Sequence, residues 1–586
     1  NGGNTMACEF IMQLSKLRKS SAESVENTNA FNHFKEYLHV ERHVEIELRK
    51  LLRSVNEKQG KCLVLLCGSA GDGKSHLISY MKNSDTEGLL DGYELYNDAT
   101  ESSEPTLTSI DTLADKLTDF DDEHYDNADG SKMIVAINLG TLNNFIESAK
   151  GKSFTKLRKY VEENKILSSY AQEIGYKDKS VFQHVSFADY QVFSLSENGI
   201  QTVFLEKLLE KVFSQNDDNP FYQSYKKEET NCQLCQRCPV RHNFEFLSDP
   251  KNQHVLIHRI VQAVIIDKTI VATREILNLL YDLIVHPDFD KQKISIGTSD
   301  VQYLDDYISW TTPMLLDEYE DISPLINAMR SHDVLRNRTA IADEEATRFH
   351  SLDNIEKVFE DTTKGTPYIV LNTISNVSQL GGIKPELKKI IYRFIARLKA
   401  MEHNLNRSEK EIRFEQYLSY LYDQNSGNEK KLAALYESTK KAVLNWDGEF
   451  GGDFICIDES NEHHWILEEL KLKAAINKDA PKITGEIQRF SPIISLRYKK
   501  DGQDNTKPVT IKIDFALYEL ISDMKAGYRP TMQDKNRHTD FVSFVQQLIE
   551  LGNKEERVTI IPKDGDKKYQ IVFEENDFGF EFKVVK

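Results

Sequence analysis

The sequence predicts an α/β core built on a parallel sheet, and three observations point to it. The run KCLVLLCGS at residues 61–69 is continuously apolar, as expected of a strand buried on both faces. It leads directly into glycines and the helical segment KSHLISYMK at 74–82. Further strand candidates at 93–100, 132–140 and 181–190 are separated by helical segments. Strands that alternate with helices are typical of parallel sheets with right-handed crossovers.

The rest of the 586-residue chain is too long to share one hydrophobic core. An amphipathic helical lead-in is expected at 31–57, packed helices suited to a lid at 255–285, and short alternating strands after about residue 450. The expected parts are a tag remnant (1–5), an α/β core with its lead-in (6–200), a cysteine-containing insertion and helical lid (201–298), a helical middle domain (299–449) and an α+β C-terminal domain (450–586).

A glycine-rich motif follows the first buried strand and opens a helix. It fits the pattern G-x-x-x-x-G-K-[ST] with the residues Gly68, Ser69, Ala70, Gly71, Asp72, Gly73, Lys74 and Ser75. Glycines let backbone amides point into one concavity, and the helix presents its positive N-terminus to phosphates. Lys74 is placed to reach the β- and γ-phosphates, and the Ser75 hydroxyl to bind Mg²⁺. The motif predicts an ATP and Mg²⁺ site in a P-loop NTPase core of the AAA+-like type.

The carboxylates that support hydrolysis are harder to assign. No apolar run ends in an acidic pair, and the residue at the expected place is Asn138. Asn138 is either the metal-side residue of a degenerate site or a polar sensor of the γ-phosphate. In the second case the acid comes from elsewhere, and Asp98, Glu101 and Asp189 lie at or just beyond the carboxyl ends of candidate strands. For each of the three taken singly, an ordinary loop carboxylate is the favoured alternative.

Arginines that contact a γ-phosphate are also candidates for catalysis. Arg274, in TREILNLL, is the candidate from the lid, and the alternative is a solvated helix arginine. Arg336 and Arg338 are the candidates for an arginine supplied to a neighbouring subunit.

The segment NCQLCQRCPVRHNF carries a compact set of metal-binding residue types. Its ligands would be Cys232, Cys235, Cys238 and His242, which could close a tetrahedral structural zinc site. Cys-x2-Cys-x2-Cys is also found in iron–sulfur ligation, although the residue at the fourth position here is histidine. Three unmetallated thiols are the remaining alternative. Seven cysteines in a chain with no recognisable secretory signal favour a reducing cytosol over a disulfide framework.

The C-terminal part offers two weaker patterns. Asp453 with Glu469 and Lys471 resembles a nuclease constellation that holds Mg²⁺, but Glu and Lys also alternate on half-exposed strands for cross-strand pairing. The region 524–552 is basic and contains Tyr528, which makes it a candidate contact for a phosphate backbone or a partner; the alternative is a solvated loop.

The formal charge of −19 is a poor footprint for a protein that coats nucleic acid by itself. Contact with DNA would therefore need a local basic groove or a partner. No apolar run approaches the roughly 18–20 residues that span a bilayer, so we expect a cytoplasmic protein without membrane contact.

Taken together, several segments resemble the DptF (DndF) family of DNA phosphorothioation-dependent restriction proteins. The segments are FKEYLHVERHVE, LLCGSAGDGKSHLISYM, YNDATES, AINLGTLNNF, CQLCQRCPVRHNFEFL, TREILNLLYDLIV and FALYELISDMKAGYRPT. The resemblance implies a cytosolic P-loop ATPase of bacterial antiphage defence. It would work with DptG- and DptH-like proteins to restrict DNA that lacks phosphorothioate marks, and it could form an oligomer. Only Gly68, Gly73, Lys74 and Ser75 carry over residue by residue.

Three functions are therefore open. The first is a nucleotide-driven subunit of a DNA restriction complex, which contacts DNA mainly through the complex. The second is a nucleotide-dependent switch or scaffold with little turnover, which the missing acidic pair favours. The third is a self-contained Mg²⁺-dependent nuclease.

Overall fold

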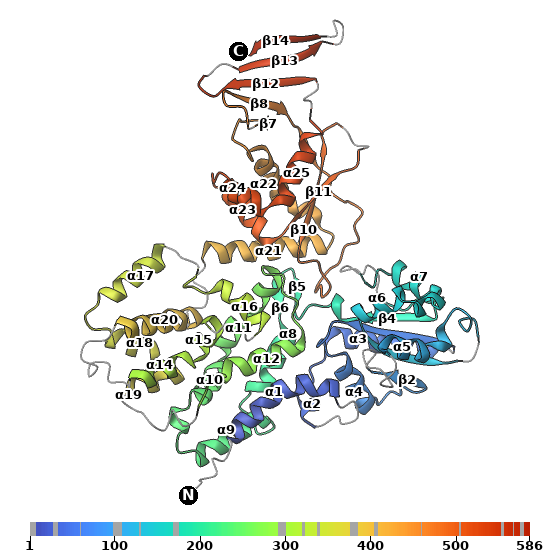
Figure 1. Cartoon of the computed structure of the whole chain (residues 1–586), viewed down its shortest axis with the longest axis vertical. Helices are drawn as coiled ribbons and strands as arrows, with labels where there is room; N and C mark the ends of the chain where they lie inside the picture. The colour runs from blue at the N-terminus through green and yellow to red at the C-terminus, as the bar shows by residue number, and fades with distance from the viewer. Residues whose placement is uncertain are drawn as a thin grey trace. The chain divides into compact units, whose positions relative to one another are not determined.

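The computed structural model describes residues 8–26, 33–58, 60–97, 108–127, 130–167, 175–290, 301–318, 323–336, 340–374, 385–402, 408–458, 460–502, 506–552, 556–565, 568–574 and 579–585 (Figure 1). The chain divides into two units. Residues 1–194 and 202–406 form the first, and residues 195–201 and 407–586 form the second.

A four-stranded parallel sheet lies at the centre of the first unit's N-terminal part. Its strands are β1 (Cys62–Gly68), β2 (Tyr93–Tyr96), β3 (Lys132–Asn138) and β4 (Phe182–Ser186), in the order β2-β3-β1-β4. Every pair is parallel, and the register sets Gly68 beside Asn138 and Cys67 beside Ser186. All residues of β1 are buried, as its continuous apolar run predicts. The predicted α/β core with a parallel sheet is confirmed.

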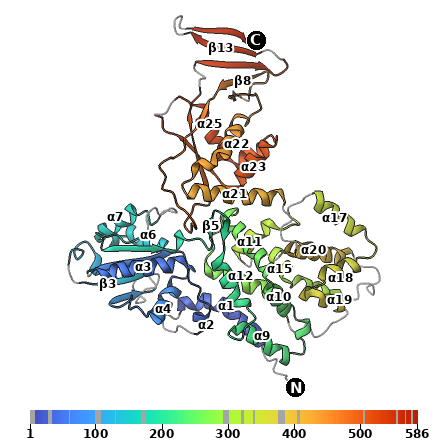
Figure 2. The ribbon, with the colours of Figure 1, turned by 180° about the vertical axis from the view of Figure 1, so that it is seen from behind.

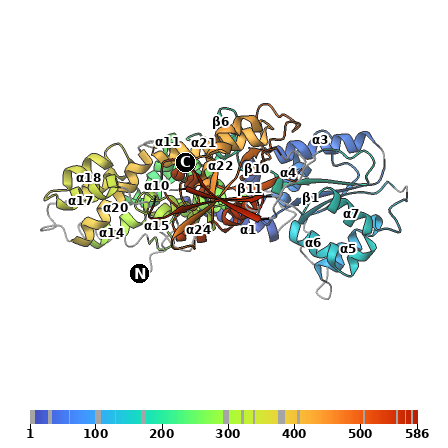
Figure 3. The same ribbon diagram turned by 90° about the horizontal axis from the view of Figure 1, so that it is seen from above.

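Helices cover both faces of this sheet. Side chains of β1 alternate between the two faces: Val64 and Leu66 pack with α3 (His43–Glu57) and α4 (Lys74–Ser84). Leu63 and Leu65 pack with α5 (Ser109–Lys116), α6 (Leu139–Glu147) and α7 (Thr155–Glu163). Figure 3 shows α3 on one side of the strands and α5 and α6 on the other. The apolar run therefore supplies both halves of the core, as a two-sided strand must.

The remainder of the first unit is helical. Helices α10, α11, α12, α15 and α20 pack against one another (Figure 2). The bounds are α1 (Glu9–Glu26), α2 (His33–Tyr37), α8 (Val203–Phe213), α9 (Pro220–Asn231), α10 (Pro239–Ser248), α11 (Pro250–Ile265), α12 (Thr273–Ile284), α14 (Val301–Ser309), α15 (Thr312–Glu318), α16 (Pro324–Met329), α17 (Ala340–Ser351), α18 (Glu356–Thr363), α19 (Val370–Ile374) and α20 (Pro385–Glu402). Buried ion pairs cross this bundle, among them Arg397 with Asp333 at 2.8 Å.

The second unit combines helices with antiparallel sheets in the orders β11-β10-β9 and β14-β13-β12-β8-β7. Its elements are β5 (Ser194–Ser196), β6 (Gly199–Gln201), α21 (Glu409–Asn425), α22 (Ala433–Leu444), β7 (Phe454–Asp458), β8 (His464–Glu469), β9 (Leu472–Ala474), β10 (Ile494–Lys500), β11 (Val509–Ile513), α23 (Phe515–Lys525), α24 (Met532–Arg537), α25 (Thr539–Ile549), β12 (Arg557–Pro562), β13 (Lys568–Glu574) and β14 (Gly579–Val585).

The helix α21 shows why the second unit begins earlier than the change of sequence pattern at residue 450. The hydroxyl of Tyr417 donates to the carbonyl oxygens of Pro492 and Ile513, each at 3.0 Å. Helices α21 and α22 thus pack with the strands that follow them, and the expected boundary at 449/450 falls inside this unit. In the described part of the chain, no helix is long and apolar enough to cross a membrane.

Candidate functional site

The glycine-rich loop connects the end of β1 to the start of α4. Gly71 and Gly73 have φ angles of 83° and 100°, a left-handed conformation that favours glycine. Gly73 is the N-cap of α4, so the turn delivers Lys74 into the first helical turn. At Gly68 a Cβ atom would lie 2.7 Å from Asp72 Oδ2 and 2.9 Å from Phe187 Cβ. The backbone of this loop therefore favours glycine at positions 71 and 73, and neighbouring side chains leave no room for a Cβ atom at position 68.

The Lys74 side chain turns back across the loop. Its Nζ donates to the carbonyl oxygen of Ser69 at 2.6 Å and to Asn138 Oδ1 at 2.8 Å. Gly68 and Asn138 are paired neighbours in the sheet, and this register brings the Asn138 amide to the ammonium. Lys74 is buried, and its contacts hold it at the carboxyl end of the strands. The structure therefore unites two of the residues that the sequence proposed for one site.

Asp72 shapes the tip of the loop from inside. Its carboxylate accepts a hydrogen bond from the Ser69 amide, and burial raises its pKa. Ser75 lies on the other side of Lys74, and its hydroxyl is 3.4 Å from the carbonyl oxygen of Asn97 at the end of β2. A hydroxyl at the start of a helix, beside a strand end, is suited to a hydrated magnesium ion.

The predicted lid helix touches the loop. Arg274, in the first turn of α12, donates its backbone amide to the carbonyl oxygen of Gly71 at 3.4 Å. A Cβ atom on Gly71 would meet Arg274 Cβ at 3.1 Å and Cδ at 3.3 Å. The loop and the start of α12 are thus in direct packing contact, and Gly71 leaves the room that the arginine stem occupies.

Arg42 is a residue of this site that sequence reasoning missed. From the residue before α3, its Nη1 donates to the Asp72 carbonyl oxygen at 3.2 Å and lies 3.5 Å from Thr273 Oγ1. Its Nη2 lies 3.5 Å from the carbonyl oxygen of Tyr190, just after β4. Burial lowers the pKa of Arg42 to about 10. One guanidinium therefore joins the loop, the lid helix and the sheet. The sequence around Arg42 does not predict this role, because a charged residue at the start of a helix is common.

A histidine pair ties α3 to the helix that follows the loop. His39 Nδ1 lies 3.0 Å from His76 Nε2, and His39 Nε2 lies 3.0 Å from Glu45 Oε2. The His39 ring stacks on Tyr80 with centroids 3.5 Å apart. Burial lowers the pKa of His76 to about 4, with the charge of His39 acting in the same direction. His76 directly follows Ser75, so this network supports the first turn of α4.

Some of the sequence candidates fall outside the described residues. Asp98, Glu101 and Arg338 lie there entirely, as does the side chain of Asp189. The backbone of Asp189 ends the short 3₁₀ helix Phe187–Asp189, directly after β4. Arg336 has an exposed side chain. The choice among the acidic candidates stays a prediction.

The cysteine-rich segment forms the turn between α9 and α10. Cys232 follows α9, Cys235 begins a 3₁₀ turn, and Cys238 is the N-cap of α10. His242 is buried, and its Nδ1 shares a hydrogen bond with the hydroxyl of Tyr307. Among the described residues, no group of three or more His, Cys, Asp or Glu side chains is arranged to hold a metal ion. The predicted zinc set of three cysteines and His242 is therefore not gathered, and zinc stays a prediction.

The nuclease-like residues lie near strand ends of the second unit and form ion pairs: Asp453 precedes β7, Glu469 ends β8, and Lys471 lies between β8 and β9. Asp453 Oδ1 is 2.9 Å from Lys440 Nζ, and Glu469 Oε1 is 2.8 Å from Lys471 Nζ. The Lys471 side chain is 57% exposed. Asp453 therefore pairs with a lysine of α22, and Glu469 pairs with the lysine two residues further along the chain.

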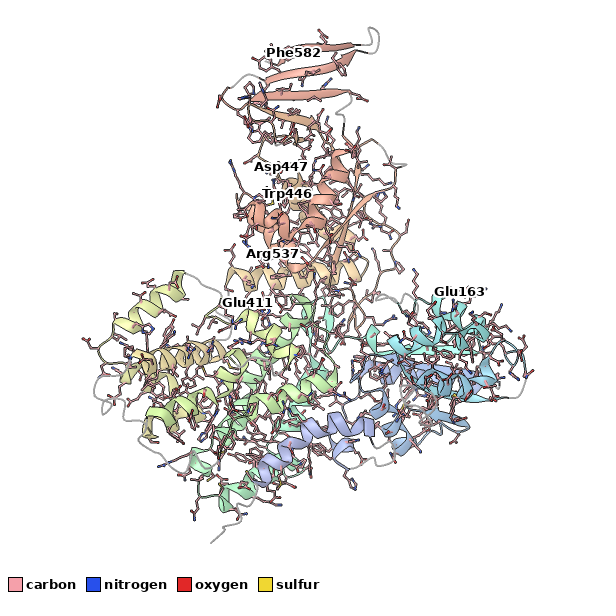
Figure 4. The ribbon with its side chains drawn as sticks, viewed as in Figure 1. Glu163, Glu411, Trp446, Asp447, Arg537 and Phe582 are labelled. Atoms are coloured by element: carbon pink, nitrogen blue, oxygen red, sulfur yellow. The ribbon has the colours of Figure 1, made fainter. Side chains whose placement is uncertain are left out.

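The basic region 524–552 is also engaged within its own unit. Lys535 Nζ donates to Asp447 Oδ1 at 2.6 Å, and the Tyr528 hydroxyl donates to Asp534 Oδ2 at 2.7 Å. Asp447 and Arg537 are labelled in Figure 4, and Trp446 beside them packs on Phe541 with ring centroids 4.9 Å apart. Part of the predicted basic surface is thus neutralised by its neighbours.

No protein-family model matches the chain, and the search of curated proteins finds no match either.

Proposed function

We propose that the first unit is a P-loop NTPase core of the AAA+-like type that binds ATP with Mg²⁺. The observation that carries the proposal is the loop itself. Left-handed Gly71 and Gly73 join a buried strand to a helix, and Lys74 is held at the loop mouth by Ser69 and Asn138. Backbone amides at a helix N-terminus favour phosphate groups.

In this site Lys74 would be the main cationic partner of the phosphates. Its present acceptors, a carbonyl and an amide oxygen, are neutral, so a phosphate oxygen offers a stronger charge-assisted hydrogen bond. Ser75 would hold Mg²⁺, which neutralises phosphate charge when it is bound. Asn138 stays within reach of the same ammonium and is suited to sense what that ammonium binds.

Nucleotide occupancy would be communicated to the lid through Arg42 and Arg274. Both arginines contact backbone carbonyls of the loop, at Asp72 and Gly71 respectively. A shift of these carbonyls on binding changes contacts made by the residue before α3 and by the start of α12. Contacts that differ between two states are what allow a ligand to shift a conformational equilibrium.

The cellular role that we propose is control of a phosphorothioation-dependent DNA restriction complex. The support is the resemblance of the ordered segments to the DptF family, together with the net charge of −19, which leaves DNA contact mainly to DptG- and DptH-like partners. The second candidate is a nucleotide-dependent switch with little turnover. Asn138 favours it, because an amide cannot act as a general base.

Phosphate release from ATP, with and without DNA, tests the enzymatic part of the proposal. Lys74→Ala is compared with Lys82→Ala, an exposed lysine at the end of the same helix. We expect Lys74→Ala to abolish any turnover and Lys82→Ala to keep it. Equal rates for Lys74→Ala and the parent protein would contradict the ATPase. Tight ATP binding without phosphate release would identify the switch.

Co-purification with the products of neighbouring genes tests the cellular role. We expect stable association with proteins of the DptG and DptH type, and an association that depends on Lys74 if nucleotide controls it. Recovery of the chain alone under ATP and under ADP would contradict the complex.

A further inference from the structure

The cysteine-rich turn has a close neighbour at the other end of the sequence. The Glu9 amide donates to Glu228 Oε1 at 2.8 Å, and Glu9 Oε1 lies 3.0 Å from Lys227 Nζ. Glu228 lies in the last turn of α9, and its carbonyl accepts the amide of Cys232 at 2.9 Å. The start of α1 is therefore fixed to the helical turn from which the cysteines emerge, and Cys8 immediately precedes it.

Aromatic packing holds the same end of α1 from the other side. The Phe10 ring lies 5.8 Å from Tyr225 of α9 and 5.2 Å from Phe244 of α10, both edge to face. Phe10 is buried, so this anchor is part of the core of the helical region. Both helices that flank the cysteine-rich turn thus contact the first turn of α1. Cys8, the residue before α1, is therefore held near the cysteine-rich turn.

The surroundings of Cys238 agree with this placement. Cys8 and Cys232 lie close enough to the Cys238 sulfur to interact with it electrostatically. The backbone amides of Val240 and Arg241, in the first turn of α10, donate to its sulfur. Amide donors at a helix start stabilise a thiolate, and metal binding requires that form of cysteine.

His242 is less suited to be the fourth ligand. It lies one turn further along α10 and is buried, whereas the cysteines of the turn are partly exposed, and the hydrogen bond of its Nδ1 with the Tyr307 hydroxyl of α14 leaves only Nε2 as a donor atom. Cys235, by contrast, is half-exposed on the turn, and its thiol donates to the Glu229 carbonyl at 3.6 Å. The Cys235 thiol thus contacts the end of α9, the helix that also contacts the start of α1, whereas His242 contacts α14.

We propose that Cys8 is the fourth ligand of a metal site formed with Cys232, Cys235 and Cys238, in place of His242. Four thiolates are a donor set for tetrahedral Zn²⁺ or for an iron–sulfur cluster. The sulfur atoms are not arranged around one point in the described structure. Cysteines bind a metal as thiolates and release their protons when the metal binds, so metal binding would draw the four sulfur atoms together. The site would fasten α1 to the α9–α10 turn, and it is independent of the proposed nucleotide function.

Metal analysis and X-ray absorption on the full-length protein, purified under reducing conditions without chelator, test this directly. We expect the purified protein to contain either about one zinc per chain or iron together with acid-labile sulfide and visible absorption. For zinc it expects four sulfur neighbours at about 2.3 Å. A shell of three sulfurs and one nitrogen at about 2.0–2.1 Å would restore His242 and overturn the proposal. Protein free of zinc and iron that also fails to take up added Zn²⁺ would overturn it as well.

Variants give a second, independent test. Cys8→Ser is expected to weaken metal retention against a competing chelator by about tenfold or more, whereas His242→Gln is expected to keep it. Cys456→Ala, a buried cysteine of β7 in the second unit, is the control for loss of a thiol. Far-UV circular dichroism checks that each variant folds. The X-ray absorption measurement uses the parent protein, so it tests the ligand set even if a variant does not fold. Metal lost from His242→Gln but kept by Cys8→Ser would contradict the assignment.

Discussion

The glycine-rich loop and the cysteine-rich turn both connect regular elements, but they are held in different ways. The conformation of the loop is determined mainly by residues close to it in sequence: the fully buried strand before it, its left-handed glycines and the contacts of Lys74. The turn is half-exposed, and its main anchor, the start of α1, comes from the far end of the sequence. The loop is therefore organised before any ligand arrives, whereas the turn is expected to reach its final form only with a metal.

The largest effect on ATP binding should come from a substitution that changes the backbone of the glycine-rich loop. Gly73→Val places a β-branched residue at a φ angle of 100°, which costs at least about 1–2 kcal/mol and distorts the helix start. We expect ATP binding to be lost while the metal content of the cysteine turn is unchanged. Calorimetric titration with ATP and Mg²⁺ measures the first effect, and metal analysis measures the second.

Gly140→Ala is the control for this change. Gly140 is exposed in α6, and a Cβ atom there meets nothing within 4 Å. Alanine should therefore stabilise the protein slightly, by up to about 1 kcal/mol, without affecting ATP. A Gly73→Val protein that binds ATP normally would show that the loop geometry does not form the nucleotide site.

Loss of the metal should leave ATP binding intact, the reverse of the result expected for Gly73→Val. Cys235→Ser is expected to lose the metal and to release the start of α1, with faster amide exchange at residues 8–12. ATP affinity should stay within about twofold, since Cys235 does not contact the loop. Hydrogen exchange followed by mass spectrometry checks the first result. If Cys235→Ser is free of metal but amide exchange at the start of α1 is unchanged, the metal does not fasten α1 to the cysteine-rich turn.

The histidine beside the loop predicts a dependence of stability on pH. The folded pKa of His76, about 4, lies below its ordinary value of 6.5, so the unfolded chain binds more protons between these values. Stability should therefore fall as the pH drops from about 6.5 to about 4, by on the order of 2–3 kcal/mol from this group. Urea unfolding of the parent protein and of His76→Gln at both pH values measures it. A fall of equal size in His76→Gln would assign the effect to other groups.

A smaller effect is expected from Arg42, which joins the loop to the lid helix. Arg42→Met removes hydrogen bonds to the carbonyls of Asp72 and Tyr190, and we expect a loss of about 1–3 kcal/mol. ATP affinity should fall along with it, because the loop loses a brace. Arg53→Met is the control: its ion pair with Glu87 is exposed and screened by solvent, so its loss should change stability little. Equal losses of ATP affinity in the two variants would contradict the bracing role of Arg42.

The same contrast explains what the sequence could predict. The buried run 62–68 and the glycines that follow it are local features, so the strand, the loop and the first turn of α4 could be predicted from the order of residues. The apolar run predicts a strand end at Asn138, β3 ends there, and the sheet register brings Asn138 to Lys74. These features depend on backbone rules that act over a few residues.

Contacts between distant segments could not be predicted in this way. Arg42 reaches Thr273 and Tyr190 only through tertiary packing. The sequence proposes His242 as a ligand because it is near the cysteines along the chain, whereas only tertiary packing of Phe10 places the start of α1 against the two helices that flank them. The expected boundary at residue 450 followed a change from helices to strands, but α21 and α22 pack with those strands in one unit.

The measurement that tests the central claim most directly is thermal unfolding with increasing ATP and Mg²⁺, for the parent protein, Lys74→Ala and Lys82→Ala. A ligand that binds the folded state stabilises it by about 2.7 kcal/mol at a hundred times its dissociation constant. We predict that the unfolding temperature rises with ATP for the parent and for Lys82→Ala, and stays constant for Lys74→Ala. An equal rise in all three proteins would show that ATP does not bind at this loop, and no rise in any of them would contradict the nucleotide site itself.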